Sequence, residues 1–304
     1  MMDRDARTQE RAKMHDVDAE HLEQQLAGVG YLADPGLVAA AVLAQRMGRP
    51  VFLEGEPGVG KSTFAEAMAP VLGAGRPIRL QCHAGIDASQ ALYDWDFPRQ
   101  VLTLRAAGEG ESVRVGDLYQ PEFLVRRPIL QAFERTPSVL LIDEIDRADD
   151  EFEACLLEVL DSGTVTIPEL GPLPGLRMPF VVLTSNQTRE VHDALKRRCL
   201  YHWIEHPDRD REVEILRRRV ERLGAPLAGQ IADAMRTLRG TEGLAKYPGI
   251  AESIDLARAV VGLGAESLTP EAAAFCAGTV AKHRDDVDVV RRVLAAGPEP
   301  RRPT

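Results

Sequence analysis

The stretch Val51-Phe-Leu-Glu-Gly55-Glu-Pro-Gly-Val-Gly60-Lys61-Ser62 decides the fold of this 304-residue chain. Its first three residues predict a short buried strand, residues 55–60 a glycine-rich turn, and residues 61–72 a helix. The spacing G-x-x-x-x-G-K-[ST] lets backbone N–H groups surround phosphate oxygens at a helix N-terminus, where Lys61 adds a positive charge and Ser62 offers a hydroxyl to Mg²⁺. The residues expected to bind the nucleotide are Gly55, Glu56, Pro57, Gly58, Val59, Gly60, Lys61, Ser62 and Thr63.

A second apolar strand, Val139-Leu-Leu-Ile142, ends in the carboxylates Asp143 and Glu144, about 80 residues further along the chain. An apolar run of this kind is typical of a parallel strand covered on both faces, and ligands of open α/β sheets bind at the carboxyl ends of such strands. We expect Asp143 to hold Mg²⁺ and Glu144 to orient and activate the water that attacks the γ-phosphate. Together with the glycine-rich loop, these acids predict a hydrolysing nucleoside triphosphatase.

Two further segments offer polar residues to the same site. The strand that starts at Phe180 ends at Asn186, whose amide is a candidate for holding the attacking water or the γ-phosphate, although an asparagine after a strand more often serves turn chemistry. Arg197 and Arg198 stand just before the last expected strand, residues 201–204. They are interpreted either as a solvated basic face or as an arginine finger, a positive charge delivered to the γ-phosphate of a neighbouring subunit.

The order of the expected elements predicts the fold class. One further strand is expected at residues 78–80, and the strand that starts at Phe180 covers residues 181–183. The alternation of the five strands with helices predicts an α/β fold with a doubly wound, parallel, five-stranded sheet. After residue 206 apolar residues recur at helical spacing without a strand signal, which predicts a small all-helical lid domain. The expected parts are an N-terminal polar segment (1–30), a nucleotide-binding core (31–206), a helical lid (207–295) and a tail (296–304).

Composition narrows the class of protein. The chain is 44% hydrophobic and carries a formal net charge of −10, which argues against a general phosphate-backbone binder, so nucleic acid is not an expected partner. Its apolar runs fall short of the roughly 18 residues of a membrane-spanning helix, and the charged sequence MMDRDARTQE, which lacks an apolar stretch, is not expected to act as a signal peptide. Four cysteines without C-x-x-C spacing are typical of reduced thiols. We expect a cytoplasmic protein without membrane association.

Two other groups of residues attract attention but predict no chemistry. The spacing of Cys199, His202 and His206 suggests metal ligands, yet the two histidines would lie about 13 Å apart in an extended segment. Each is therefore expected to be a surface histidine or one hydrogen-bonded within the fold. The acidic residues 285, 286 and 288 are expected to form a solvated helix end.

The order of these motifs resembles AAA+ ATPases over residues 31–290. Within that superfamily the chain is similar to the MoxR-type branch, through LLIDEIDRADDEFEACLLEVLDSGTVTIPE (140–169), VVLTSN (181–186) and DALKRRCLYHWIEHP (193–207). More narrowly, LQCHAGIDASQALYDW (80–95) and KRRCLYHWIEHPD (196–208) resemble the MoxR-like ATPases encoded with aerobic carbon monoxide dehydrogenase. Those relatives are thought to help mature a molybdenum enzyme alongside a von Willebrand A-domain partner.

The resemblance assigns roles residue by residue. It implies that residues 55–62 are the Walker A loop, Asp143 and Glu144 the Walker B acids, and Asn186 the polar sensor 1. Arg198 fits the arginine finger because it directly precedes the fifth strand, with Arg197 as the alternative. Residues 82–128 take the place of a helix-2 insert, and residues 161–178 that of a pre-sensor hairpin.

The resemblance further implies ATP and Mg²⁺ as cofactors and a homo-hexameric ring. A von Willebrand A-domain protein and a client metalloenzyme would be the partners. One departure concerns the lid, where Ala251 stands at the place of the sensor-2 arginine of many relatives. Lys246 or Arg258 are possible substitutes, and the sequence assigns neither.

Two other functions remain open at this stage. One is a nucleic-acid motor subunit of a restriction-type complex, which the acidic net charge disfavours. The other is a structural protein that uses ATP only to assemble, which Glu144 and the paired arginines disfavour. The sequence names neither the client nor the number of subunits in the ring.

Overall fold

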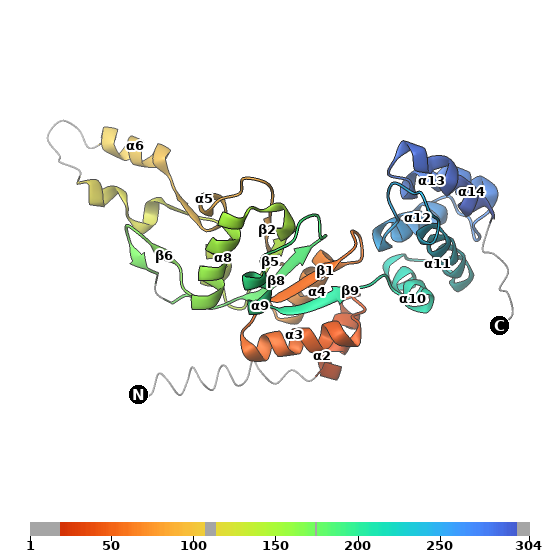
Figure 1. Cartoon of the computed structure of the whole chain (residues 1–304), viewed down its shortest axis with the longest axis horizontal. Helices are drawn as coiled ribbons and strands as arrows, with labels where there is room; N and C mark the ends of the chain where they lie inside the picture. The colour runs from red at the N-terminus through yellow and green to blue at the C-terminus, as the bar shows by residue number, and fades with distance from the viewer. Residues whose placement is uncertain (1–18, 107–113, 174, 297–304) are drawn as a thin grey trace. The chain divides into compact units, whose positions relative to one another are not determined.

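Figure 1 shows a computed structural model of the chain, which describes residues 19–106, 114–173 and 175–296. Residues 1–18 of the expected N-terminal segment, 107–113 of the insert, 174 of the hairpin and 297–304 of the tail lie outside the described residues. The chain divides into two compact units. The first comprises residues up to 29, 33–54 and 62–203, and the second comprises residues 30–32, 55–61 and those from 204 onward.

A five-stranded parallel sheet organises the first unit, which confirms the predicted fold class. Its strands are β1 (Val51–Gly55), β2 (Ile78–Gln81), β5 (Val139–Asp143), β8 (Phe180–Ser185) and β9 (Leu200–Ile204), in the order β2-β5-β8-β1-β9. Every residue of β1 and of β5 is buried. In the parallel pairing of β2 with β5, Gln81 stands opposite Asp143. The carboxyl ends of β2, β5 and β8 therefore share one edge of the sheet, where the predicted polar residues gather.

Helices complete the core of this unit. They are α2 (Ala19–Gly28), α3 (Pro35–Met47), α4 (Lys61–Val71), α7 (Pro128–Glu134), the 3-10 turn η3 (Ile145–Arg147), α8 (Asp150–Ser162) and α9 (Asp193–Arg198). Helix α3 begins as the sequence indicates, because Asp34 Oδ1 accepts a hydrogen bond from Leu37 N at 2.8 Å and Pro35 occupies the first turn. Among the largest fully buried side chains are Phe52, Phe64 and Phe133.

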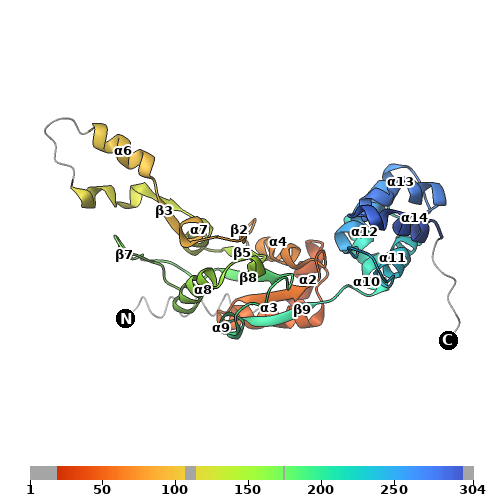
Figure 2. The same ribbon diagram turned by 45° about the horizontal axis from the view of Figure 1, so that its top comes forward.

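The expected insert and hairpin are small structures attached to this core. The insert contains α5 (Ala88–Ala91), β3 (Tyr93–Trp95), α6 (Phe97–Ala106), the 3-10 turns η1 (Val115–Leu118) and η2 (Pro121–Phe123), and β4 (Leu124–Arg126), with β3 and β4 antiparallel. Helix α6 extends away from the sheet in Figures 1 and 2. Residues 161–178 contain the antiparallel pair β6 (Thr166–Ile167) and β7 (Gly171–Pro172).

The second unit is a helical bundle. It contains α10 (Arg209–Arg219), α11 (Ala225–Arg239), α12 (Ile250–Gly262), α13 (Pro270–Val280), the 3-10 turn η4 (Arg284–Asp286) and α14 (Val287–Ala296). Apolar stripes of these helices meet in one cluster, in which Leu216, Ile231 and Leu256 are fully buried. Within the part of the chain that the structure describes, no helix is long and apolar enough to cross a membrane.

The prediction of a solvated acidic helix end is wrong for Asp286. Its side chain is buried, and its two carboxylate oxygens accept hydrogen bonds from the backbone N of Ala245 at 2.8 Å and of Lys246 at 3.2 Å. Asp285 and Asp288 are exposed as expected. The carboxylate of Asp286 thus satisfies backbone donors of the loop before α12, a long-range role that a run of acidic residues does not reveal.

Candidate nucleotide site

The glycine-rich loop closes around the Lys61 side chain. Gly58 and Gly60 have φ values of +83° and +101°, in the left-handed region that glycine adopts without strain. Lys61 is buried, and its Nζ donates hydrogen bonds to the carbonyl oxygens of Gly55 at 2.6 Å and Glu56 at 2.8 Å. The loop therefore holds one ammonium charge at the N-terminus of α4, an arrangement suited to phosphate binding.

The N-terminus of α12 contacts this loop directly, within the second unit. The backbone N of Ile250 donates a hydrogen bond to the carbonyl of Gly58 at 3.0 Å. A Cβ atom at Gly249 would lie 2.8 Å from Gly58 Cα, so the approach requires glycine at that position. Glu252 completes the turn by accepting a hydrogen bond from Gly249 N at 2.9 Å. Sequence reasoning looked for a cation near Ala251 and missed this backbone contact.

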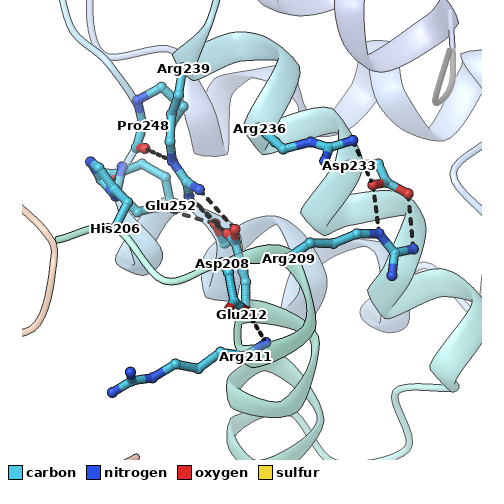
Figure 3. Close-up of polar contacts among 12 residues, drawn as sticks. His206, Asp208, Arg209, Arg211, Glu212, Asp233, Arg236, Arg239, Pro248 and Glu252 are labelled. Atoms are coloured by element: carbon cyan, nitrogen blue, oxygen red, sulfur yellow. Dashed lines mark hydrogen bonds and ion pairs between the residues drawn. The ribbon is translucent and has the colours of Figure 1, made fainter. Parts of the chain in front are cut away.

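A buried ion pair fixes the loop that leads into α12, as Figure 3 shows. Both guanidinium Nη atoms of Arg239 donate to the buried carboxylate of Glu212 at 2.8 Å, and its Nε donates to the carbonyl of Pro248 at 2.8 Å. Ser253 donates a further hydrogen bond to Glu212 at 2.6 Å. Arg258, considered for sensor 2, stands 3.8 Å from Asp255 on its own helix. Sensor 2 stays unassigned.

Asp143 is the centre of the polar edge in the first unit. Its side chain is 4% exposed, and Oδ1 accepts hydrogen bonds from the hydroxyls of Ser62, at 2.8 Å, and of Thr184. Its Oδ2 pairs with the guanidinium of Arg79. A serine hydroxyl beside a carboxylate is the hard oxygen donor set that Mg²⁺ prefers, so the residues present fit the expected metal ion.

Glu144 lies beside Asp143 among three polar side chains. Its backbone has φ +56° and its N–H donates to Thr184 Oγ1 at 3.0 Å, which turns the residue out of the strand. The carboxylate accepts hydrogen bonds from Gln81 Nε2 at 3.0 Å and Asn186 Nδ2 at 3.3 Å, and it stands 3.0 Å from Arg147 Nε. The structure thus brings together the predicted Ser62, Asp143, Glu144 and Asn186.

Gln81 and Thr184 are polar residues at this edge that sequence reasoning missed. Both occupy the carboxyl-terminal part of a strand that adjoins β5. A search for polar residues at the end of the less apolar strand β2 would have found Gln81, and attention to every polar residue of the strand that leads to Asn186 would have found Thr184.

Buried acids tie the segment after β8 to the segment after β5. Asp146 Oδ2 accepts hydrogen bonds from the backbone N of Thr188 at 2.9 Å and from its hydroxyl at 2.6 Å. Glu153, 1% exposed, pairs with Arg189 and accepts a hydrogen bond from His192 N at 2.9 Å. Because these contacts fix the chain just beyond Asn186, they restrict where its amide can reach.

The two candidate finger arginines differ in their surroundings. Arg198 forms an ion pair with Asp161 of α8, whereas the side chain of Arg197 is 81% exposed and stands 3.9 Å from Asp193. Arg49 fixes the backbone of both arginines, since its guanidinium donates hydrogen bonds to the carbonyls of Arg198, at 2.9 Å, and of Arg197. The backbone of this pair is therefore held in place while one of its side chains projects into solvent.

The cysteines near the site are buried, and the nearby histidines contact carboxylates. Burial, assisted by the charge of Asp143, raises the pKa of the Cys82 thiol to about 12, and burial raises the pKa of Cys199 to about 12. His202 contacts Asp34 at 3.1 Å, and His206 contacts Glu56 at 3.0 Å. These thiols are therefore unreactive, and each histidine has a carboxylate partner in its own unit.

A glycine-rich loop that follows β1 and acids at the end of β5, in a parallel α/β sheet, are features of the P-loop class of nucleotide-binding proteins. Residues 50–199 match the family model described as the AAA domain of the dynein-related subfamily. We assign this segment to the AAA domain, the coarser part of the resemblance stated above.

Individual relatives are distant. The uncharacterized protein YehL of Escherichia coli is 29% identical over 172 residues, which are 54% of this chain and 43% of YehL. The chain thus aligns with less than half of that relative's length. Two solved structures of RuvB variants from Thermotoga maritima are similar at TM-scores of 0.43 and 0.45 and 17% and 18% identity, covering 86% and 85% of this chain and 68% of each RuvB chain.

Proposed function

We propose that this chain is a Mg²⁺-dependent ATPase of the AAA+ type. The observation that carries the proposal is the position of Glu144, which Gln81 and Asn186 hold beside the Asp143–Ser62 pair. A carboxylate presented by two amide donors is oriented to accept a proton from an attacking water molecule. A protein that only binds nucleotide has no need of this arrangement.

The chain's own residues divide the work. Lys61 and the loop N–H groups would bind the phosphates, and Asp143 with Ser62 would hold Mg²⁺, because Lys61 and Ser62 are successive residues at the start of α4. When bound, Mg²⁺ neutralises phosphate charge. Glu144 orients and deprotonates the attacking water, and Asn186 fixes the carboxylate and the water.

The test is to replace Glu144 by glutamine, which removes the base but keeps the hydrogen-bonding shape. Glu144→Gln should bind ATP with unchanged affinity and lose at least about 100-fold in phosphate release. Lys61→Ala should instead weaken nucleotide binding, as measured by calorimetry. Glu134→Gln is the matched control, because Glu134 lies on α7 and pairs with Arg126 of β4 at 2.9 Å. Normal turnover in Glu144→Gln would remove the residue from the mechanism and contradict the proposal.

We further propose that the chain works as a cytoplasmic, homo-hexameric ring that remodels a client protein. Support comes from Arg197 and Arg198, whose fixed backbone and exposed position suit delivery of a charge to a neighbouring subunit. The insert (82–128) and the hairpin (161–178) would move against the client as nucleotide turns over.

The partners proposed rest on the resemblance to MoxR-like ATPases encoded with carbon monoxide dehydrogenase. They are a von Willebrand A-domain protein and a client metalloenzyme, such as a molybdenum carbon monoxide dehydrogenase. Affinity capture from native extract tests this, with Glu144→Gln held in Mg-ATP as bait and Lys61→Ala as control. Recovery of a von Willebrand A-domain protein on the ATP-held bait alone supports the proposal, and recovery of nucleic acid or a nuclease instead contradicts it.

A further inference from the structure

Asp143 already has a cationic partner. Arg79 lies two residues before Gln81 on β2, so both side chains leave the same face of the strand that pairs with β5. Its Nη2 reaches Asp143 Oδ2 as an ion pair and also donates a hydrogen bond to Gln81 Oε1 at 2.6 Å. The Arg79 side chain is 56% exposed while that of Asp143 is 4% exposed.

The pairing explains how this edge of the sheet tolerates a buried carboxylate. The hydroxyls of Ser62 and Thr184 satisfy Oδ1 with hydrogen bonds but supply no charge. A buried carboxylate without a counter-charge is costly, and the guanidinium of Arg79 supplies that charge. A divalent cation held by the same carboxylate would do the same, and two cations a few ångströms apart repel each other.

We infer that Arg79 is a resident counter-cation of Asp143 that competes with Mg²⁺ for this carboxylate. The inference rests on the proposed function, in which Asp143 holds the metal ion. Because more than half of the Arg79 side chain is exposed, the guanidinium can turn into solvent without disturbing the core. While Arg79 is paired with Asp143, Mg²⁺ without nucleotide binds poorly. The negative charge of bound nucleotide phosphates is needed for Mg²⁺ to displace Arg79 from Asp143.

The competition between Arg79 and Mg²⁺ for Asp143 also affects Glu144, through Gln81. Arg79 donates to the Gln81 oxygen, and the Gln81 nitrogen donates to Glu144 Oε2 at 3.0 Å. Departure of Arg79 from Asp143 therefore removes one restraint on the amide that holds Glu144. Arg79 acts through Asp143 and Gln81, so it is a positioning residue.

The test measures metal binding without turnover. The probe is a fluorescent N-methylanthraniloyl derivative of ADP, bound to the full chain and titrated with Mg²⁺. Arg79→Gln, which keeps a hydrogen-bond donor but removes the charge, should lower the Mg²⁺ concentration at the midpoint by about tenfold. Arg126→Gln is the control, because Arg126 is similarly half-exposed and pairs with Glu134, and its midpoint should equal that of the wild type.

Arg79→Lys keeps the charge on a shorter and more strongly hydrated side chain, so its midpoint should lie between those of the wild type and of Arg79→Gln. If Arg79→Gln does not fold, the inference is tested with Arg79→Lys alone. A Mg²⁺ midpoint of Arg79→Lys at or above that of the wild type overturns the inference. An unchanged or raised midpoint in Arg79→Gln overturns it as well. A wild-type chain that binds no nucleotide overturns the proposed function and the inference together, whereas normal nucleotide binding with equal midpoints overturns the inference alone.

Discussion

The acids at the end of β5 and the arginines at the end of α9 belong to the same compact unit, but they differ in how many partners the chain gives their side chains. Asp143 and Glu144 each have three polar side-chain partners, drawn from β2, β8 and the adjoining helical segments. Arg197, by contrast, projects into solvent from a backbone that Arg49 holds. A single chain therefore preorganises the acidic half of the site.

This difference fits the proposed function, in which the acids act within one chain and an arginine acts on a neighbouring subunit. Groups that act within one chain are held by its own hydrogen bonds, since catalysis gains from dipoles that need no reorganisation. A group that acts on another chain has to be fixed at its base and free at its tip. Arg197 meets this description better than Arg198, whose guanidinium is engaged by Asp161.

Replacing Arg197 should therefore lower the rate of phosphate release more than replacing Arg198. The opposite result would contradict the contrast drawn between the two arginines. We predict that Arg197→Ala lowers phosphate release of assembled rings by about 1,000-fold, because a trans arginine supplies charge stabilisation of that size. Arg198→Ala loses a half-exposed ion pair and should lower the rate by less than about tenfold. Steady-state phosphate release, with assembly checked by light scattering, gives both values.

Mixed rings provide the control for this prediction. Arg197→Ala subunits added to the wild type should poison hydrolysis beyond simple dilution, because each one impairs its neighbour's site. Activity that falls only in proportion to the wild-type fraction would place Arg197 outside the trans site. A larger loss in Arg198→Ala than in Arg197→Ala would reverse the two roles.

The hydroxyl of Thr184 tests how strongly the chain holds the two acids in place. We predict that Thr184→Val, which keeps the shape of the side chain, lowers the free energy of unfolding by about 2 kcal/mol, because it leaves Glu144 N–H and Asp143 each without one partner in a buried place. Urea unfolding measures the loss. The control is Thr103→Val, since Thr103 is exposed and its hydroxyl donates to the carbonyl of Arg99 on its own helix. Equal losses in the two variants would show that the buried hydroxyl is dispensable.

Local patterns predicted the sheet and most of the acidic half. Apolar runs that end in polar residues located β5 and β8, and with them Asp143, Glu144 and Asn186. Gln81 and Arg79 escaped notice because β2 is only partly buried, with exposed residues at both of their positions, so its sequence lacks a strong strand signal. Their roles depend on which strand pairs with β5, and that is a property of topology rather than of neighbouring residues.

The contact between Gly58 and Gly249 could not be predicted for a related reason. Nearly 200 residues separate them, and a glycine in a lid loop gives no sign of what approaches it. We predict that Gly249→Ala weakens binding of the fluorescent ADP by about tenfold, because the new Cβ would displace the phosphate loop at Gly58. Gly262→Ala is the control, since a Cβ there meets nothing within 4 Å. Equal affinities would mean that the loop yields without cost.

The smallest effect concerns the thiols beside the acidic half. Burial raises the pKa of Cys82 from 9.0 to about 12, so at a pH between these values the unfolded thiol is ionised while the native thiol is not. The unfolded state then binds fewer protons than the native state, and stability falls as the pH rises above about 9. Cys82→Ala should flatten this decline in urea unfolding measured at successive pH values, and Cys155→Ala, at a less buried position, should flatten it less. If the decline were the same in both variants, Cys82 would be ionising freely in the native state, and the acidic edge around Asp143 would be more open to water than its burial indicates.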